Sequence, residues 1–427
     1  LASKNHMSAA LESSDLLPKV PRLPLSEVPE VSAYFKNTLR AMFGEDEDKV
    51  RSYVQEITQT PWTPERMRER LAGIEDGEAL KSAMRRLRRD VMINLVARDI
   101  SGLANLEEVV TVMSDLAEIA IDRTISVYAK ELAKRFGVPR SETGVPQDLI
   151  VIGMGKLGGR ELNVSSDIDM IFFYDCDGEC GPTPEYPTVR KIISNQEFYE
   201  RLAKKVIPAL SEITWEGFVF RVDMRLRPNG ESGMLVSSVD SFEKYQKNED
   251  GTGAWLWEHQ ALTRARYAAG DRDIGDKFEK IRIEILRRER NAEETKAEVL
   301  KMRQRMHDGH PNKTELFDVK HDEGGMVDVE FIVQYLVLQY SAKFPQLVNN
   351  FGNIKMLEMA SDAGLIPKDL ALEVSAIYRK YRLIQHEFRL NSPSVPVRVP
   401  KEEFADDAAK VRELWSLVFG PSEGQEA

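Results

Sequence analysis

The chain has 427 residues, 30% of them charged, and a formal net charge of −11. This length allows two or three domains with ample core, and an acidic chain lacks the net positive surface that general nucleic-acid binding needs. Two cysteines are too few for a disulfide framework, and no apolar run reaches the roughly 20 residues of a membrane span, so we expect a cytoplasmic protein without membrane contact.

Helical periodicity dominates the first third of the chain. Residues 1–30 are punctuated by proline and serine and are expected to be loose, and residues 31–140 are expected to form a helical domain. Asn105 and Glu108 form a capping-box pattern. This pattern predicts the start of a long amphipathic helix, which we expect to end at Gly137.

Period-two patterns replace the helical ones in residues 141–270. Strands are predicted at Leu149–Met154 and Ile168–Tyr174, and the cleanest alternation of apolar and charged residues predicts a third strand at Gly217–Arg227. A helix is expected from Ser194 to about Ser211. We therefore expect a small mixed sheet in this part of the chain.

Helical patterns return after about Trp255, and residues 271–427 are expected to form a C-terminal helical bundle. The expected helices are Asp276–Arg288, Ala292–Met306, Met326–Tyr340, Asn353–Ala363, Leu370–Leu390 and Asp406–Phe419. The predicted fold class is therefore α+β and mostly helical, with a small mixed sheet flanked by helical bundles.

Two aspartates mark the entry to the second expected strand, in the stretch VIGMGKLGGRELNVSSDIDMIFFY between Val151 and Tyr174. Asp167 and Asp169 are spaced i and i+2, so on a strand their side chains point to the same face. Like charges held this close repel unless cations lie between them, and the pair therefore predicts a magnesium site. The alternative is a pair of solvated loop carboxylates, which the apolar run that begins at Ile168 disfavours.

A third acid, Asp223, lies on the expected strand Gly217–Arg227. A lone aspartate on a second strand facing the same cleft is what a two-metal site needs, because two divalent ions require three or more carboxylate arms. The alternative is an ion-pair ladder with the basic residues of the same strand. Those basic residues are equally suited to neutralising phosphate charge: Arg221, Arg225 and Arg227.

The turn before the aspartates, GMGKLG at residues 153–158, is rich in glycine and contains one lysine. It matches the GxGxxG pattern, but only eight residues separate Gly158 from Asp167, too few for the βαβ crossover of a dinucleotide-binding Rossmann fold. A Walker loop is disfavoured too, because Leu157 follows Lys156. We interpret the segment as a turn that brings backbone N–H groups against phosphate oxygens.

Two further clusters have weaker functional interpretations. The stretch WLWEHQ at residues 255–260, with Arg264 and Arg266, is either a substrate-facing helix or a helix with core tryptophans. Three histidines have loose metal-ligand spacing, but no cysteines accompany them, which disfavours zinc: His307, His310 and His321.

Four segments from about Leu80 to Phe419 resemble the glutamine synthetase adenylyltransferase/adenylyl-removing family: GMGKLGGRELNVSSDIDMIFF, FVFRVDMRLRPNGESG, WEHQALTRARYAAGD and KHDEGGMVDVEFIVQYLVLQY. The resemblance implies a polymerase-beta-type nucleotidyltransferase domain flanked by helical bundles. It also implies Mg²⁺, ATP and, as the modified group, a tyrosine hydroxyl of glutamine synthetase. The P-II signal protein and glutamine are implied as a further partner and effector.

The resemblance also assigns roles to residues of this chain. Asp167, Asp169 and Asp223 are implied as catalytic, metal-binding residues. The implied nucleotide-binding residues are Gly155, Lys156, Gly158, Gly159, Ser165, Ser166 and Arg225.

The direction of the reaction stays open at the level of sequence. Family members usually carry two catalytic halves, one that attaches AMP and one that removes it by phosphorolysis with ADP as product, and this chain has one Asp-x-Asp site. Residues up to about Gly230 resemble the removing copy, and those from Met234 resemble the attaching copy, as expected for a fragment or a natural fusion of two half-copies. We favour attachment; removal and a catalytically silent module that binds glutamine synthetase or P-II are the alternatives.

Overall fold

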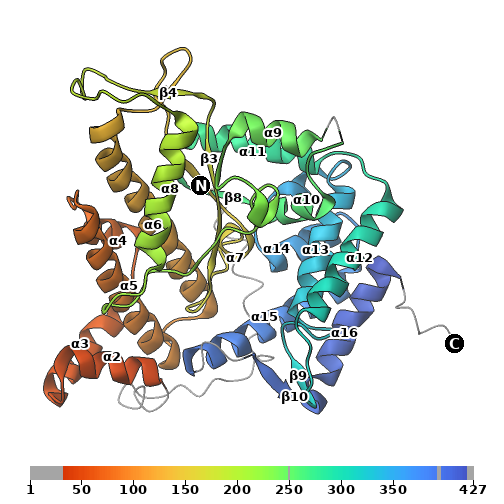
Figure 1. Ribbon diagram of the computed structural model, residues 1–427. Coiled ribbons are helices and arrows are strands. Elements are labelled where there is room, and N and C mark those ends of the chain that lie inside the picture. The colour runs from red at the N-terminus through yellow and green to blue at the C-terminus, as the bar shows by residue number, and fades with distance from the viewer. Residues whose placement is uncertain (1–31, 249–250, 392–395, 421–427) are drawn as a thin grey trace, which may run out of the picture.

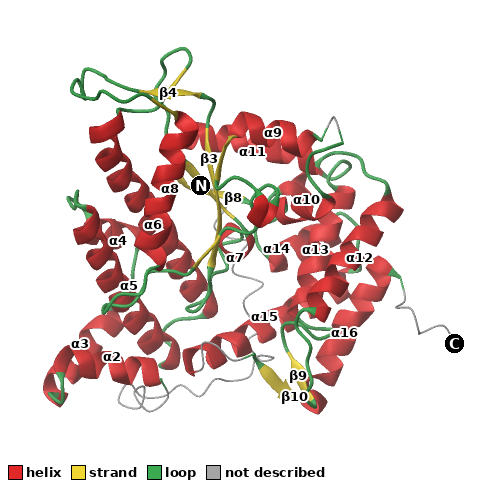
Figure 2. Ribbon diagram, in the orientation of Figure 1, coloured by secondary structure: helices red, strands yellow, loops and turns green. Residues whose placement is uncertain are grey.

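The computed structural model describes residues 32–248, 251–391 and 396–420 (Figure 1). The predicted loose segment, residues 1–30, lies outside these ranges. The described chain is mostly helical, with short strands at its centre and at two of its edges (Figure 2), so the expected α+β, mostly helical class is confirmed. Among the described residues, no helix combines the length and apolar character needed to cross a membrane.

The N-terminal part is a group of helices joined by short turns. Asn105 caps α6, as predicted, by accepting a hydrogen bond from the Glu108 backbone N–H at 2.9 Å. Gly137 ends α6 with φ +78°, a conformation that favours glycine. The helices are α2 (Ala33–Phe43), α3 (Glu47–Gln59), α4 (Pro64–Leu71), α5 (Gly77–Ile100), α6 (Leu106–Phe136) and, later in the chain, α8 (Asn195–Ser211).

The central sheet has the strand order β6-β3-β2-β8, with β7 also paired to β3. Strand β2 is antiparallel to both β3 and β8, whereas β6 and β7 each run parallel to β3. The predicted strands at Leu149–Met154 and Ile168–Tyr174 are thereby confirmed. The strands are β2 (Ile150–Gly153), β3 (Ile168–Tyr174), β6 (Val222–Asp223), β7 (Val236–Ser238) and β8 (Arg266–Gly270).

The predicted strand Gly217–Arg227 is wrong in extent, because only Val222–Asp223 form a strand. The backbone N–H groups of Val219 and Phe220 both donate to the Leu210 carbonyl at the end of α8, at 2.9 and 3.0 Å. Both side chains are buried, so the period-two pattern breaks at this point. Anchoring to a helix end therefore replaces sheet pairing over the first half of the segment.

The C-terminal part is a second helical group, and all six predicted helices are present to within a few residues, apart from earlier starts in α11 and α16. Helix α13 has the predicted bounds. The helices after β7 are α9 (Val239–Lys247) and α10 (Leu256–Leu262), which precede β8, and then α11 (Arg272–Leu286), α12 (Ala292–Asp308), α13 (Met326–Tyr340), α14 (Asn353–Asp362), α15 (Lys368–Asn391) and α16 (Lys401–Phe419).

Short elements complete the described chain. Three small strands form a separate sheet of order β1-β4-β5, and β9 pairs with β10 in an antiparallel ribbon. These strands are β1 (Arg140–Ser141), β4 (Gly178–Cys180), β5 (Ile193–Ser194), β9 (Leu316–Asp318) and β10 (Arg398–Pro400). The remaining helical turns are α7 (Gly155–Gly158), η3 (Gly230–Ser232) and η4 (Pro345–Val348).

The central sheet separates two hydrophobic cores. On β3, Met170 and Phe172 pack with α6 and α8, whereas Ile171 and Phe173 pack with α11 and α13. This division follows from the alternation of side chains along a strand. In Figure 1 helices α2 to α6 accordingly lie on one side of β3 and α7, helices α10, α12, α13 and α16 lie on the other, and α15 runs across below them.

Candidate functional site

The three predicted metal-binding aspartates meet where β3 and β6 begin to pair. Asp169 and Asp223 are direct register partners on these parallel strands. Burial raises the pKa of Asp169 to about 7, and the negative charges of Asp223 and Asp167 contribute to the same shift. Asp169 and Asp223 therefore lie side by side on neighbouring strands, and Asp167 lies two residues before Asp169.

Two arginines of the segment around β6 neutralise part of this acidic cluster. The Arg221 Nε donates to Asp167 Oδ1 at 2.5 Å. The Arg225 Nε donates to both Asp223 carboxylate oxygens at 3.0 and 2.9 Å, and this bonding holds the pKa of Asp223 below its usual range. Arg227 instead donates to the carbonyls of the turn after β6. The side chains are therefore arranged as the ion-pair alternative predicts.

The donor chemistry of the cluster fits a divalent cation. Its carboxylate oxygens are the ligands that Mg²⁺ prefers, and a cation between Asp169 and Asp223 would relieve the repulsion that raises the pKa of Asp169. With the arginine pairs formed, no three acidic, imidazole or thiol side chains of the described residues surround a common point as metal ligands.

The glycine turn packs directly against this cluster. Gly155 has φ +51°, and a Cβ there would lie 2.9 Å from the Asp169 Oδ2. A Cβ at Gly158 would lie 1.7 Å from the Arg264 carbonyl oxygen. Because β2 and β3, which flank the turn, are antiparallel, the parallel βαβ crossover of a Rossmann fold is absent here. The absence of a side chain at these two glycines lets the turn pack closely against Asp169 and against Arg264, two residues before β8.

Ser165 and Ser166, predicted to lie near phosphates, are organised by Asn163, which the sequence interpretation missed. The buried Asn163 side chain accepts hydrogen bonds from the Ser165 N–H at 3.1 Å, the Ser165 hydroxyl at 3.3 Å and the Ser166 hydroxyl at 2.9 Å. An asparagine that bonds to the backbone two residues on is a common turn device. Such an asparagine two residues before a serine pair was the available signal.

Lys156 lies between the glycine turn and the C-terminal helices. Its Nζ donates to Gln385 Oε1 on α15 at 3.3 Å. Burial lowers the pKa of Lys156 to about 7, and the positive charges of Arg382 and Lys320 lower it further. The last predicted residue of the turn, Gly159, faces the Arg264 guanidinium, which any side chain at that position would meet.

A buried ionic network centred on Glu161 fixes the loop between α7 and β3. The Glu161 carboxylate pairs with Arg264 at 2.5 Å and Arg382 at 3.5 Å, and it accepts from the Asn353 backbone N–H at 3.1 Å. Burial alone would raise the pKa of Glu161, but the two guanidinium groups outweigh it and hold that pKa below its usual range. Arg266 likewise bonds to the Gly158 carbonyl at 2.9 Å. Arg264 and Arg266 are thus structural anchors.

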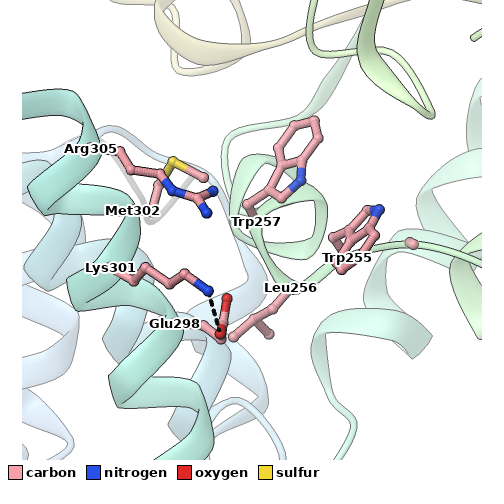
Figure 3. Close-up of a pocket in the computed structure, with 8 residues that line it drawn as sticks. Trp255, Leu256, Trp257, Glu298, Lys301, Met302 and Arg305 are labelled. Carbon is pink, nitrogen blue, oxygen red and sulfur yellow. Dashed lines mark ion pairs between the residues drawn. The ribbon is translucent and has the colours of Figure 1, made fainter. Parts of the chain in front are cut away.

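The predicted tryptophan cluster lines a separate cavity with a volume of about 510 Å³ (Figure 3). Trp255 is 66% exposed, so it is not a core residue. Figure 3 shows Arg305 reaching from α12 toward Trp257 of α10, and Lys301 reaching toward Glu298, with which it pairs at 3.7 Å. The aspartates do not line this cavity.

The predicted histidines do not form a zinc site among the described residues. The rings of His310 and His321 stack, with centroids 4.1 Å apart. The Nδ1 of His310 lies 2.9 Å from the Met306 carbonyl oxygen. These contacts connect the end of α12 to the loop after β9.

Comparison with known proteins identifies relatives over most of the chain. A family model described as glutamate-ammonia ligase adenylyltransferase matches residues 26–281, and one described as GlnD PII-uridylyltransferase matches residues 292–411. Bifunctional glutamine synthetase adenylyltransferase/adenylyl-removing enzymes from Bordetella bronchiseptica and Aromatoleum aromaticum are each 42% identical, over 81% and 83% of this chain. These matches cover 34% and 35% of the relatives, so the chain spans about a third of their length.

Proposed function

This chain belongs to the glutamate-ammonia ligase adenylyltransferase family, and we propose that it moves AMP from ATP to a tyrosine hydroxyl of glutamine synthetase. The observation that carries the proposal is the pairing of Asp169 with Asp223 across β3 and β6, next to the glycine turn. The names of the relatives support glutamine synthetase as the protein modified. We further propose that the central sheet and its turn form a polymerase-beta-type nucleotidyltransferase domain.

In this proposal the three aspartates hold Mg²⁺, which supplies charge neutralisation at the phosphates and a lowered pKa for the incoming hydroxyl. The tyrosine oxygen attacks the α-phosphorus in line, the bond from that phosphorus to the bridging oxygen breaks, and pyrophosphate leaves. The chain contributes positioning and electrostatic stabilisation. The residues proposed to contact the nucleotide are Gly155, Lys156, Gly158, Gly159, Ser165, Ser166 and Arg225.

The arginine pairs give the site two states. With Arg221 on Asp167 and Arg225 on Asp223, the acids are neutralised without a metal. When a metal binds, these guanidinium groups become free to contact phosphate oxygens, for which their planar donor geometry is suited. The two interpretations of the basic residues, ion pairs and phosphate contacts, therefore describe the same side chains before and after loading.

The alternative functions differ in direction or in class. Phosphorolytic removal of AMP from modified glutamine synthetase would use the same acids, with inorganic phosphate as the nucleophile and ADP as product. A catalytically silent module that binds glutamine synthetase or P-II would not need the acids, and the proximity of Asp167, Asp169 and Asp223 argues against it. P-II and glutamine are proposed as partner and effector only from the resemblance of the sequence.

The test is a pair of reactions with the chain, Mg²⁺ and labelled nucleotide. One contains unmodified glutamine synthetase with labelled ATP; the other contains AMP-modified synthetase with phosphate. Label on the synthetase in the first supports attachment, and ADP in the second supports removal. A chain that does neither, and binds no ATP with Mg²⁺, would leave only the silent module.

Asp169→Asn is expected to lower the rate of whichever reaction the chain catalyses by at least about 10²-fold, because it removes a metal-binding charge from the reacting centre. The matched control is Asp175→Asn, one residue beyond β3, where the carboxylate pairs with Lys277 at 2.7 Å. The control is expected to keep near-normal activity. A folded Asp169→Asn variant with full activity would refute the assignment of the site.

A further inference from the structure

The Lys156 ammonium is held by a side chain more than 200 residues away in the sequence. Gln385 Oε1 on α15 accepts from Lys156 Nζ at 3.3 Å and from Asn163 Nδ2 at 3.5 Å. The Gln385 side chain is buried, so this oxygen is held in place by the packing of α15. One acceptor from the C-terminal bundle therefore fixes both the lysine of the glycine turn and the asparagine of the serine loop.

The same helix also holds the backbone of that loop. One turn earlier on α15, Arg382 donates to the Glu161 carbonyl at 2.7 Å and pairs with its carboxylate at 3.5 Å. Asn163 in turn organises Ser165 and Ser166. The predicted phosphate-binding residues are thus assembled against α15, which lies in the region matched by the second family model.

The choice of an amide at this position has an electrostatic consequence. The charged groups that act on Lys156 include Arg382 and Lys320, which are cationic, and Glu330, Glu161 and Asp169, which are anionic. Within the described residues no carboxylate forms an ion pair with Lys156, and Glu161 is already paired with guanidinium groups. Gln385 is thus a neutral acceptor that orients the Lys156 amino group and forms no ion pair with it.

We propose that Gln385 is a positioning residue that holds Lys156 and the Asn163 turn ready for the β- and γ-phosphates of the nucleotide. The inference rests on the proposed function and adds the C-terminal bundle to the nucleotide site. An acceptor that fixes the lysine without forming an ion pair with it leaves the amino group able to pair with the polyphosphate of ATP rather than with AMP, which lacks the two outer phosphates. Gln385 itself touches no substrate atom in this proposal.

The experiment measures Mg²⁺-dependent binding of ATP and of AMP to the full chain and to three variants, with KM for ATP and kcat alongside. Gln385→Leu removes the acceptor at similar size, and we expect the Kd for ATP to rise about tenfold, as for a lost hydrogen bond to a charged group. Gln385→Glu keeps the acceptor but pairs its negative charge with Lys156, and we expect a similar rise. The Kd for AMP is expected to change less than about twofold in both Gln385 variants. We expect the KM for ATP to rise in these variants while kcat stays nearly unchanged.

Arg379→Ala is the matched control, because Arg379 lies on the same helix and pairs with Glu107 of α6. It is expected to bind both nucleotides as the wild-type chain does. If Gln385 were only structural, Gln385→Glu would bind ATP normally, or ATP and AMP would weaken together; either result overturns the inference alone. A wild-type chain that binds no ATP with Mg²⁺ overturns the proposed function and this inference with it.

Discussion

His259 is a half-buried imidazole whose two ring nitrogens both have partners. Its Nε2 lies 3.1 Å from the Gln246 carbonyl oxygen and therefore donates to it, while Nδ1 lies 3.4 Å from the Arg290 guanidinium and accepts from it. A second proton on the ring would face that guanidinium at Nδ1. Burial, with the nearby positive charge of Arg290, lowers the pKa of His259 to about 4.

The lowered pKa of His259 predicts a pH dependence of stability. Between its unfolded value near 6.5 and its folded value near 4, the unfolded chain binds the proton and the folded chain does not. The contribution of neutral His259 to the free energy of unfolding is therefore fully present above pH 6.5 and is lost as the pH falls toward 4. His259→Gln, which keeps a donor for Gln246, is expected to flatten the fall in free energy of unfolding between pH 7 and 5, measured with urea.

His307 supplies the control for this prediction, because its imidazole is 43% exposed. His307→Gln is expected to leave the slope of the free energy of unfolding against pH unchanged. Equal slopes for the wild-type chain and for His259→Gln would contradict the tautomer and burial assigned to His259.

At the scale of elements, the glycine turn is fixed by backbone contacts that allow no side chain. Gly158→Ala would place a methyl group 1.7 Å from the Arg264 carbonyl oxygen, so either α7 or the start of β8 must move. We expect the free energy of unfolding to fall by about 1–3 kcal/mol, as for overpacking. Urea denaturation checks this, with Gly309→Ala as control, where the nearest atom would lie at 3.4 Å. A Gly158→Ala variant as stable as the control would contradict the close packing.

The elements that could be predicted from sequence are those with local signals. The cap at Asn105 and the apolar runs of β3 and α13 depend on residues within a few positions of one another, so their bounds were predicted well. The segment after α8 was predicted wrongly, since Val219 and Phe220 bond to a helix end rather than to a strand. Alternation alone does not show which partner a backbone N–H will find.

The residues of the candidate site also divide into those with local sequence signals and those fixed by contacts between distant parts of the chain. The aspartates and the glycine turn lie within a short stretch, so their proximity follows from the sequence, and the third acid required only the pairing of β6 with β3. The roles of Glu161 and Gln385 depend on contacts that span about 190 to 230 residues. Chain pattern carries no information about such pairs, which is why the sequence interpretation missed them.

At the scale of the whole molecule, α15 connects the parts of the described chain. His386 lies 2.8 Å from Asp99 at the end of α5, and Arg379 pairs with Glu107 at the start of α6, so α15 contacts the N-terminal helices. The same helix reaches the glycine turn through Gln385. The domain boundaries predicted near residues 140 and 270 stay predictions, because the sheet between them shares its two faces with both helical groups.

This sharing predicts that the two cores unfold together. Phe172 and Phe173 are adjacent and fully buried, and they pack in opposite cores because they lie on opposite faces of β3. Because one strand supplies side chains to both cores, unfolding of either core that displaces β3 also disrupts the other core. Phe172→Leu and Phe173→Leu are each expected to cost about 1–3 kcal/mol and to shift one common calorimetric transition to lower temperature.

The control is Leu372→Ala on α15, whose side chain is 59% exposed and should leave that transition unchanged. Two resolved transitions, with Phe172→Leu shifting one and Phe173→Leu shifting the other, would show that the helical groups unfold independently. A single shifted transition would instead make the central sheet the element through which a change in the C-terminal bundle reaches the aspartates. In that case substitutions in the core of α11 and α13 should weaken ATP binding in step with their loss of stability, even though they lie outside the site.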